Sequence, residues 1–361
     1  MEEESQHKES AKRNELLDRF QRETEQSGDK WKDALDRIKT NRKLARGGVC
    51  GEGDSSPEKE EKVRANIIYS TLRSIIPHIY ARDPEVAAVP SQKAGSEGQL
   101  YEWSRKFGET LEIMINHEFK NSKLKEKHKR LLRSVQVSRV GLCKVTFQRD
   151  YFTDPLMRDR LADAQDNLAN LTSRIERLRE ENISSEQEEA DAEELMDMMD
   201  GLQAQVEVLR AQGMVIDQVN INNFRIGEVE SLQDYRQAPW MQDRIWYQKK
   251  DFMDRFNYTE DMMQPITVYQ RKGEQARAVA RDEDSKMPDD GWVAVWERWS
   301  RTTNTVYTWA DGADSWIREP YQPAITSERW FPYFMFGFHW VDGEYWPMSD
   351  VEMLENLAQE Y

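Results

Sequence analysis

Hydrophobic residues in the first 140 positions recur every three or four residues, which is the spacing of amphipathic helices. Residues 1–45 are mostly charged with few apolar positions, so we expect charged helices that become ordered only against a packing partner. A strongly apolar helix is predicted over 63–81, kinked by Pro77, which lacks an amide proton. A second helical stretch over 99–138 breaks near Asn121–Ser122. Its first half carries an apolar stripe at Leu100, Trp103, Phe107, Leu111 and Met114.

Residues 46–57, rich in Gly and Ser, predict a linker. Ser56 can cap a helix, and Pro57 suits the first helical position. The linker is therefore expected to end where the next helix starts.

The period changes at Gly141, where apolar and charged residues begin to alternate as in a β-strand. Residues 58–152 together with 214–262 are predicted to form one α+β domain, with strands over 214–250 and a short helix over 249–262.

Residues 156–212 carry the heptad pattern of an inserted, acidic, antiparallel coiled-coil hairpin. The predicted seam of the first arm comprises Leu161, Ala164, Leu168, Leu171, Ile175 and Leu178. A turn near Asn182–Ser185 leads into a second arm, whose apolar positions are Leu195, Met198, Leu202, Val206 and Leu209. A solvated charged helix without a partner is the alternative.

The last third of the chain begins with residues 263–290, which predict a polar linker. Residues 291–347 predict consecutive strands, with a tight turn at Asp311–Gly312. Ser349 and Glu352 form a capping box, so a helix is expected to begin in 348–361. Because no C-cap follows, we expect this helix to continue beyond the sequence or in another chain.

Composition and charge exclude several classes of protein. The 361 residues carry a net charge of −16, which argues against simple high-affinity binding of nucleic acid. Most of the excess lies within 150–213, with 17 acidic and 6 basic residues. No stretch of about 18 apolar residues predicts a membrane span, and the amino terminus lacks the apolar region of a secretory signal. Cys50 and Cys143 predict neither a disulfide framework nor a zinc site, so a reducing cytoplasm is expected.

No motif predicts catalysis, a cofactor or a metal. Phosphate-binding loops, zinc-protease motifs and a nucleophile elbow are absent from the sequence. His117–Glu118 has no second ligand one helical turn away, and residues 289–291 read better as a turn than as a cation site. Eight of the 12 tryptophans lie between Trp292 and Trp346; burial in a small sheet is favoured over a ligand platform or a subunit interface.

Several short segments follow one another along the chain in a recognisable order. They are Val63–Asn66, Ile79–Pro84 with Val86 and Val89–Pro90, Val219–Ile226, Trp296–Trp299, Asp311–Gly312, Phe331–Tyr333 and Tyr345–Asp350. Their order and spacing resemble portal proteins of tailed bacteriophages, and the resemblance spans residues 60–150 and 214–361. Residues 219–226 lack the proline found in the matching strand of that family.

The resemblance implies an α+β fold with a helical wing that contains a mixed sheet. The coiled-coil hairpin would be an insertion, 291–347 a Trp-rich β clip-like region, and 348–361 the start of a stem helix. The sequence would then be a carboxy-terminally truncated portal protein.

The implied function is mechanical. Portal proteins assemble with copies of themselves into a ring, usually of twelve subunits. The ring forms in the host cytoplasm and occupies a capsid vertex of the virion. Double-stranded DNA passes through the ring without sequence specificity, driven by the terminase large subunit. A tail adaptor and a capsid or scaffold protein are further partners; no membrane, cofactor or catalytic residue is implied.

The resemblance also suggests contact residues. Arg298, Arg301, Trp309 and Trp316 are candidates for contacts with the motor, the tail or a neighbouring subunit. Leu168, Ile175 and Leu202 are candidates for contacts with capsid or scaffold protein, with the hairpin projecting from the outer rim of the ring.

Two other readings stay open. One is a non-viral cytoplasmic adaptor or structural protein that recruits a partner through the coiled coil. The other is a carbohydrate-active enzyme using Glu297 and Glu319, which would require both carboxyl groups to face one cleft.

Overall fold

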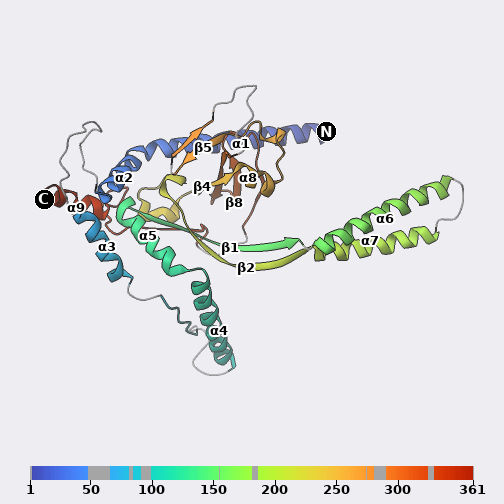
Figure 1. Ribbon diagram of the computed structural model, residues 1–361, viewed down its shortest axis with the longest axis horizontal. Coiled ribbons are helices and arrows are strands. Elements are labelled where there is room, and N and C mark those ends of the chain that lie inside the picture. Colours follow the sequence, from blue (N-terminus) through green and yellow to red (C-terminus); the bar gives the residue numbers. More distant parts are fainter. Residues whose placement is uncertain are drawn as a thin grey trace. The chain divides into compact units, whose positions relative to one another are not determined.

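The computed structural model of the chain combines helices with antiparallel strands, which confirms the predicted α+β class (Figure 1). It divides into two compact units, called here the body (Met1–Val145 with Ile216–Tyr361) and the hairpin unit (Thr146–Val215). The structure describes residues 2–47, 66–80, 84–90, 99–153, 155–180, 186–273, 275–279, 290–323 and 329–360.

Among the described residues, seven α-helices belong to the body. They are α1 (Glu2–Lys30), α2 (Lys32–Ala45), α3 (Ile67–Ile79), α4 (Gln99–Asn121), α5 (Leu124–Ser138) and α8 (Lys249–Phe256), and α9 (Asp350–Glu360) follows at the carboxyl end. The predicted break between α4 and α5 is confirmed, because Lys123 adopts a positive φ of 51° there. The predicted capping box is confirmed as well: the Glu352 amide donates to Ser349 Oγ at 3.2 Å.

The linker predicted over 46–57 and the helix start at Ser56–Pro57 lie almost wholly outside the described residues. Within the described part, α3 begins after Asn66, whose side chain accepts a hydrogen bond from the Tyr69 amide at 2.9 Å. Pro77 lies in the last turn, and the helix ends two residues later.

Two antiparallel sheets form the centre of the body. The larger runs in the order β3 (Phe224–Ile226), β4 (Trp240–Gln248), β7 (Trp292–Ser300), β5 (Val268–Lys272) and β6 (Gln275–Ala278), and β7 also pairs with β8 (Thr305–Ala310), which pairs with β9 (Arg318–Tyr321). The smaller runs β10 (Tyr333–Phe336), β1 (Gly141–Thr153) and β2 (Glu207–Gln218). Every strand pair given a register is antiparallel, so the prediction of a mixed sheet was wrong.

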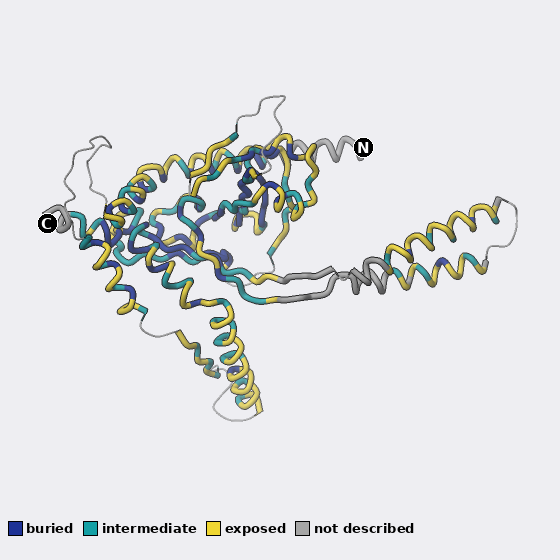
Figure 2. Tube along the Cα trace, viewed as in Figure 1, coloured by how far each residue is buried: buried dark blue, intermediate teal, exposed yellow. Residues whose placement is uncertain are grey.

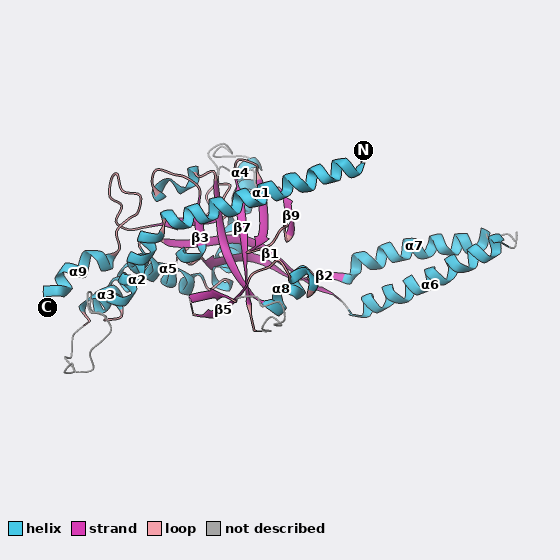
Figure 3. Cartoon of the chain, turned by 90° about the horizontal axis from the view of Figure 1, so that it is seen from above, coloured by secondary structure: helices cyan, strands magenta, loops and turns pink. Residues whose placement is uncertain are grey.

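Helix α1 crosses the larger sheet (Figure 3). Leu17 and Phe20 of α1 pack against Trp296, Tyr307 and Trp309 of the sheet. A second core joins the two sheets and contains Trp31, Phe224, Met241, Trp299 and Tyr333. The charged amino-terminal helices thus have the packing partner that the sequence required.

Strands of the regions predicted as wing-like and clip-like pair directly with each other. Strand β7 pairs with β4 along its whole length, from Trp292 opposite Gln248 to Ser300 opposite Trp240. The strands of 291–321 therefore share one sheet with those of 214–262. A strand pair of nine residues buries both backbones, and the sequence period carries no information about which strand supplies the partner.

The segment predicted as a polar linker, 263–290, also differs. Its described part contains strands β5 and β6, paired from Tyr269–Ala278 to Lys272–Gln275. Met263, Ile266 and Val268 are buried in a cluster with Phe252 and Val293, which anchors this hairpin to the sheet.

The turn predicted at Asp311–Gly312 is confirmed. Gly312 has a φ of +81°, and a Cβ at this position would lie 2.6 Å from the Pro265 carbonyl oxygen. Glycine is needed here both for its backbone conformation and for the close approach of a neighbouring chain segment.

The hairpin unit contains α6 (Pro155–Glu180) and α7 (Glu186–Val206), which pack on each other. Ala164 and Ile175 are buried in this seam, and most other described positions are exposed (Figure 2). The second arm was predicted in part wrongly: Met198 is 53% exposed, and Leu209 lies in strand β2 instead of the helix. Among the described side chains of α7, Ala192 is buried and Leu195 is half-buried.

Candidate functional site

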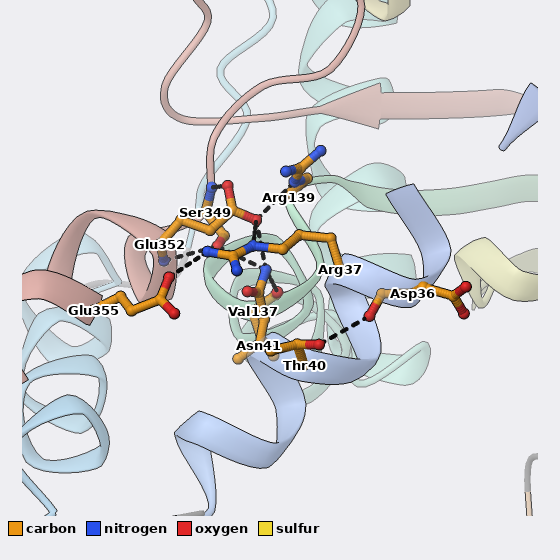
Figure 4. A network of polar contacts seen from close by, with 9 residues as sticks. All are labelled: Asp36, Arg37, Thr40, Asn41, Val137, Arg139, Ser349, Glu352 and Glu355. Atoms are coloured by element: carbon orange, nitrogen blue, oxygen red, sulfur yellow. Dashed lines mark hydrogen bonds and ion pairs between the residues drawn. The ribbon is translucent and has the colours of Figure 1, made fainter. Parts of the chain in front are cut away.

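The first turn of α9 is held by a polar cluster that we call the α9 anchor (Figure 4). It joins three elements: α2, the end of α5 and the start of α9. Its members are Arg37, Asn41, Arg139, Ser349, Glu352 and Glu355.

Glu352 is the centre of the α9 anchor, with only 6% of its side chain exposed. Its Oε1 accepts hydrogen bonds from Arg139 Nε and from Asn41 Nδ2, each at 2.7 Å. Arg37 Nε lies 3.6 Å from the same oxygen, and the Arg37 guanidinium also donates to Glu355. The Glu352 carboxylate thus connects the start of α9 to α2 and to the end of α5.

The fully buried Asn41 extends the α9 anchor. Its amide donates to Ser349 Oγ at 3.1 Å and to the Val137 carbonyl oxygen at 3.3 Å. Beneath it, Leu44, Ile68, Leu72 and Val351 form an apolar cluster that joins α2, α3 and α9. The direction in which α9 leaves the body is therefore set by both polar and apolar contacts.

The residues around Glu352 favour its ionised form. Burial alone would raise the pKa of Glu352, but the hydrogen bonds from Arg139 and Asn41 outweigh it, and the pKa is lowered. The anchor is thus an ionised, hydrogen-bonded cluster at neutral pH that fixes the start of α9.

A second polar group, which we call the buried charge cluster, joins the two sheets. Lys144 Nζ of β1 lies 2.8 Å from both Asp243 Oδ1 of β4 and Glu297 Oε1 of β7. Tyr333 of β10 donates to Asp243, and Trp299 Nε1 donates to Glu297 at 2.7 Å.

Electrostatics keep this cluster ionised around Lys144. Burial lowers the pKa of Lys144, but the two carboxylates outweigh burial and raise it. Burial raises the pKa of Asp243, whereas the pKa of Glu297 is lowered because Lys144 and the Trp299 hydrogen bond outweigh burial. A lysine held protonated between two carboxylates ties strands together, and a protonated amine has no lone pair with which to act as a nucleophile.

A cavity of about 700 Å³ lies between α1 and the edge of the larger sheet. Its wall includes Phe20, Trp31, Trp240 and Trp346, with Arg298 at one side. The Arg298 guanidinium lies between the rings of Phe20 and Trp240, 3.9 and 4.0 Å from their centroids, and donates to Glu23. Burial lowers the pKa of Arg298 to about 10.

This placement corrects two of the candidate contact residues. Arg298 is 2% exposed and Trp309 is 1% exposed, so neither can meet a motor, a tail or a neighbouring subunit while the body is folded. Trp316 is half-buried against Phe20, and Arg301 is exposed and donates to the Arg236 carbonyl oxygen at 3.0 Å. These contacts were assigned from the resemblance alone, which does not indicate that α1 covers this face of the sheet.

The three candidate capsid or scaffold contacts in the hairpin unit also differ in how far their side chains are buried. Ile175 is buried in the seam, Leu168 is half-buried, and the side chain of Leu202 lies outside the described residues. Ile175 therefore stabilises the hairpin and is not an exposed capsid or scaffold contact.

The carboxylate pair considered for glycoside chemistry has different surroundings at its two members. Glu297 is held by Lys144 and Trp299 inside the body, whereas Glu319 is exposed. Among the described residues, no three His, Cys, Asp or Glu side chains gather as a metal site would require. In the same part of the chain, none of the helices has the length and apolar character needed to cross a bilayer.

Sequence reasoning missed the members of both polar clusters except Ser349, Glu352 and Glu297. The available signal was a charged residue inside an apolar strand, as at Lys144 and Asp243, which predicts a buried partner. No signal of this kind marks Asn41, because an asparagine within a charged helix is usually exposed.

No protein-family model matches the chain, and no curated protein matches it.

Proposed function

We propose that this chain is a subunit of a viral portal ring that forms a channel for double-stranded DNA. The observation that carries the proposal is the α9 anchor: the segment Tyr345–Asp350, which resembles the family's entry into a stem helix, leads into a helix whose first turn is clamped to α2 and α5. A channel wall built from such helices needs their direction fixed against the force of moving DNA.

The body gives further support. Three of the resembling segments contribute to its sheets: Trp296–Trp299 lies in β7, Asp311–Gly312 is the turn after β8, and Phe331–Tyr333 leads into β10. In this proposal α3 to α5 and both sheets form one wing-and-clip body, and α9 begins the stem. The terminase motor, a tail adaptor and the capsid or scaffold would bind the assembled ring.

The function of the ring follows from shape and charge. A wall that gripped phosphates through many Lys and Arg side chains would bind DNA with strong salt dependence and would hinder sliding. Of the net charge of −16, −11 lies within residues 150–213, so the rest of the chain has a net charge of only −5. A wall of this near-neutral character is suited to let DNA pass. The assembled ring would occupy a capsid vertex of the virion.

The decisive experiment is electron microscopy of the full-length gene product, with its mass measured by native mass spectrometry. We expect a closed ring with a central hole wide enough for duplex DNA. Compact single particles without a hole, at a mass of one or two chains, would contradict the proposal and favour the coiled-coil adaptor.

Deletion of residues 157–212 tests the part played by the hairpin unit. If this compact unit contacts only capsid or scaffold protein at the outer rim, the ring survives its removal while incorporation into capsids is impaired. Loss of the ring on deletion would contradict a role for the hairpin at the outer rim only.

A further inference from the structure

Helix α4 carries an apolar stripe that the rest of the described chain leaves open. Leu100, Trp103, Phe107 and Met114 are 63, 65, 52 and 59% exposed, and their spacing of three, four and seven places them on one face of the helix. Trp103 and Phe107 stack in parallel, with ring centroids 5.5 Å apart. Contiguous exposed apolar surface of this kind marks an interaction site.

The opposite face of α4 is already occupied, which makes the stripe a separate surface. Gly108 lies against Ala88, and Asn116 exchanges two hydrogen bonds of 3.0 Å with the backbone of Val86. The helix is therefore fixed on one side by the segment 84–90 and presents the stripe on another.

Helix α5 follows α4 along the chain, contacts it and carries positive charge. Its 15 residues contain five Lys and Arg and one Glu, and Arg130 and Arg133 are exposed. Two consecutive helices thus present an apolar stripe on α4 and exposed basic residues on α5.

The complementary surface is found on α7. This helix of 21 residues contains eight Asp and Glu and neither Lys nor Arg. Asp191, Glu194 and Met198 are exposed, and their spacing of three and four places them on one face. Methionine adapts readily to an aromatic surface.

We infer that α7 of a second copy docks on the α4 stripe and the basic face of α5, as a heterologous contact between neighbouring chains. Two different patches of one chain that complement each other generate a ring when the rotation closes. The length also fits: α7 rises about 30 Å, and the stripe from Leu100 to Met114 about 21 Å, so one helix can cover the stripe and reach α5. This inference rests on the proposed ring and names one of its contacts.

A charge swap tests the contact. The first variant is Asp191→Lys with Glu194→Lys, and the second is Arg130→Glu with Arg133→Glu. Each variant alone sets like charges opposite each other, so assembly of the full-length product, measured by native mass spectrometry at low salt, should fall at least about tenfold. An equimolar mixture of the two variants restores opposite charges across every contact and should restore assembly.

The mixture also separates contacts between chains from contacts within one chain. If all four substitutions in one chain restore assembly but the mixture of the two variants does not, α7 binds α5 of its own chain and the inference is wrong. If the second variant assembles normally and loses only bound DNA, the basic face serves nucleic acid and the inference is also wrong.

The apolar half of the surface has a matched control. Trp103→Ser should reduce assembly about as strongly as a charge reversal, whereas Ile113→Ser should leave it unchanged, because Ile113 is 71% exposed on another side of the same helix. Equal effects of the two substitutions would contradict docking on the stripe.

Failure of this contact and failure of the ring can be distinguished. Rings that survive both charge reversals contradict the contact and leave the portal proposal standing. If the product forms dimers or open chains, and their assembly is lost in each variant and restored in the mixture, the portal ring is contradicted and the contact is supported.

Discussion

The body and the hairpin unit use charged residues in opposite ways. In the body, Lys144, Glu297 and Glu352 are buried and joined by hydrogen bonds to several elements. In the hairpin unit, Arg179 pairs with Glu189 at 2.8 Å, yet both side chains are largely exposed, at 66 and 45%. Because water screens exposed charges and leaves buried ones unscreened, similar distances carry very different free energies.

The two units obtain their stability from different kinds of contact. The body depends on long-range contacts through a shared core, so loss of one charge is felt by several strands. The hairpin unit depends on an apolar seam between two helices and tolerates changes at its surface.

Lys144→Met should have the largest effect. It leaves Asp243 and Glu297 buried without a cation, which typically costs about 3–5 kcal/mol of unfolding free energy. Urea denaturation of the full chain measures it. As a control, Lys144→Met combined with Asp243→Asn and Glu297→Gln removes all three charges and should recover a large part of the loss; a single-variant loss under about 1 kcal/mol would contradict the role of the cluster.

Glu352→Gln should have the next largest effect. It removes the charge that Arg139 and Asn41 stabilise, so a loss of about 2 kcal/mol is expected, as for hydrogen bonds to charged groups. Hydrogen exchange should rise first in α9. Glu355→Gln is the matched control, because Glu355 pairs with Arg37 at the edge of the anchor and should cost less than half as much.

Acid should destabilise the body through the same groups. The pKa values of Glu297 and Glu352 are lower in the folded state, so their contribution is fully present above the unfolded value of about 4.3 and is lost as pH falls through the folded value. Stability of the wild type should therefore fall more steeply below about pH 4.3 than that of Glu352→Gln. The difference in slope is at most about 1.4 kcal/mol per pH unit, since one proton is involved; equal slopes would show that Glu352 does not titrate differently on folding.

Arg179→Ala should have the smallest effect. An exposed pair contributes about 0–1 kcal/mol, and salt screens it further. A double-mutant cycle with Glu189→Ala, followed by hydrogen exchange in α6 and α7, measures the coupling. A coupling above about 2 kcal/mol would show that the hairpin unit shares the energetics of the body.

Local structure could be read from the sequence where it depends on neighbours along the chain. The break before α5, the capping box of Ser349 and Glu352, the Asp311–Gly312 turn and the seam positions Ala164 and Ile175 were all predicted. Each depends on residues within about one or two helical turns or within a single tight turn.

The errors share a different cause. Leu209 continues the apolar pattern of α7 but lies in β2, and 263–290 is polar in composition but contributes β5 and β6 to the sheet. In both segments, pairing with distant strands overrides the local preference. Arg298 and Trp309 were assigned to a surface because the sequence does not state that α1 covers it.

The sequence by itself therefore determined the order and type of most elements, the acidic hairpin and the start of α9, because hydrophobic period and capping act over a few residues. Only the tertiary structure decided that β4 and β7 share a sheet, that Lys144 is clamped between two carboxylates and that the stripe on α4 stays open. These features join residues up to hundreds of positions apart, and their free energy comes from burial and pairing that exist only once the chain is folded.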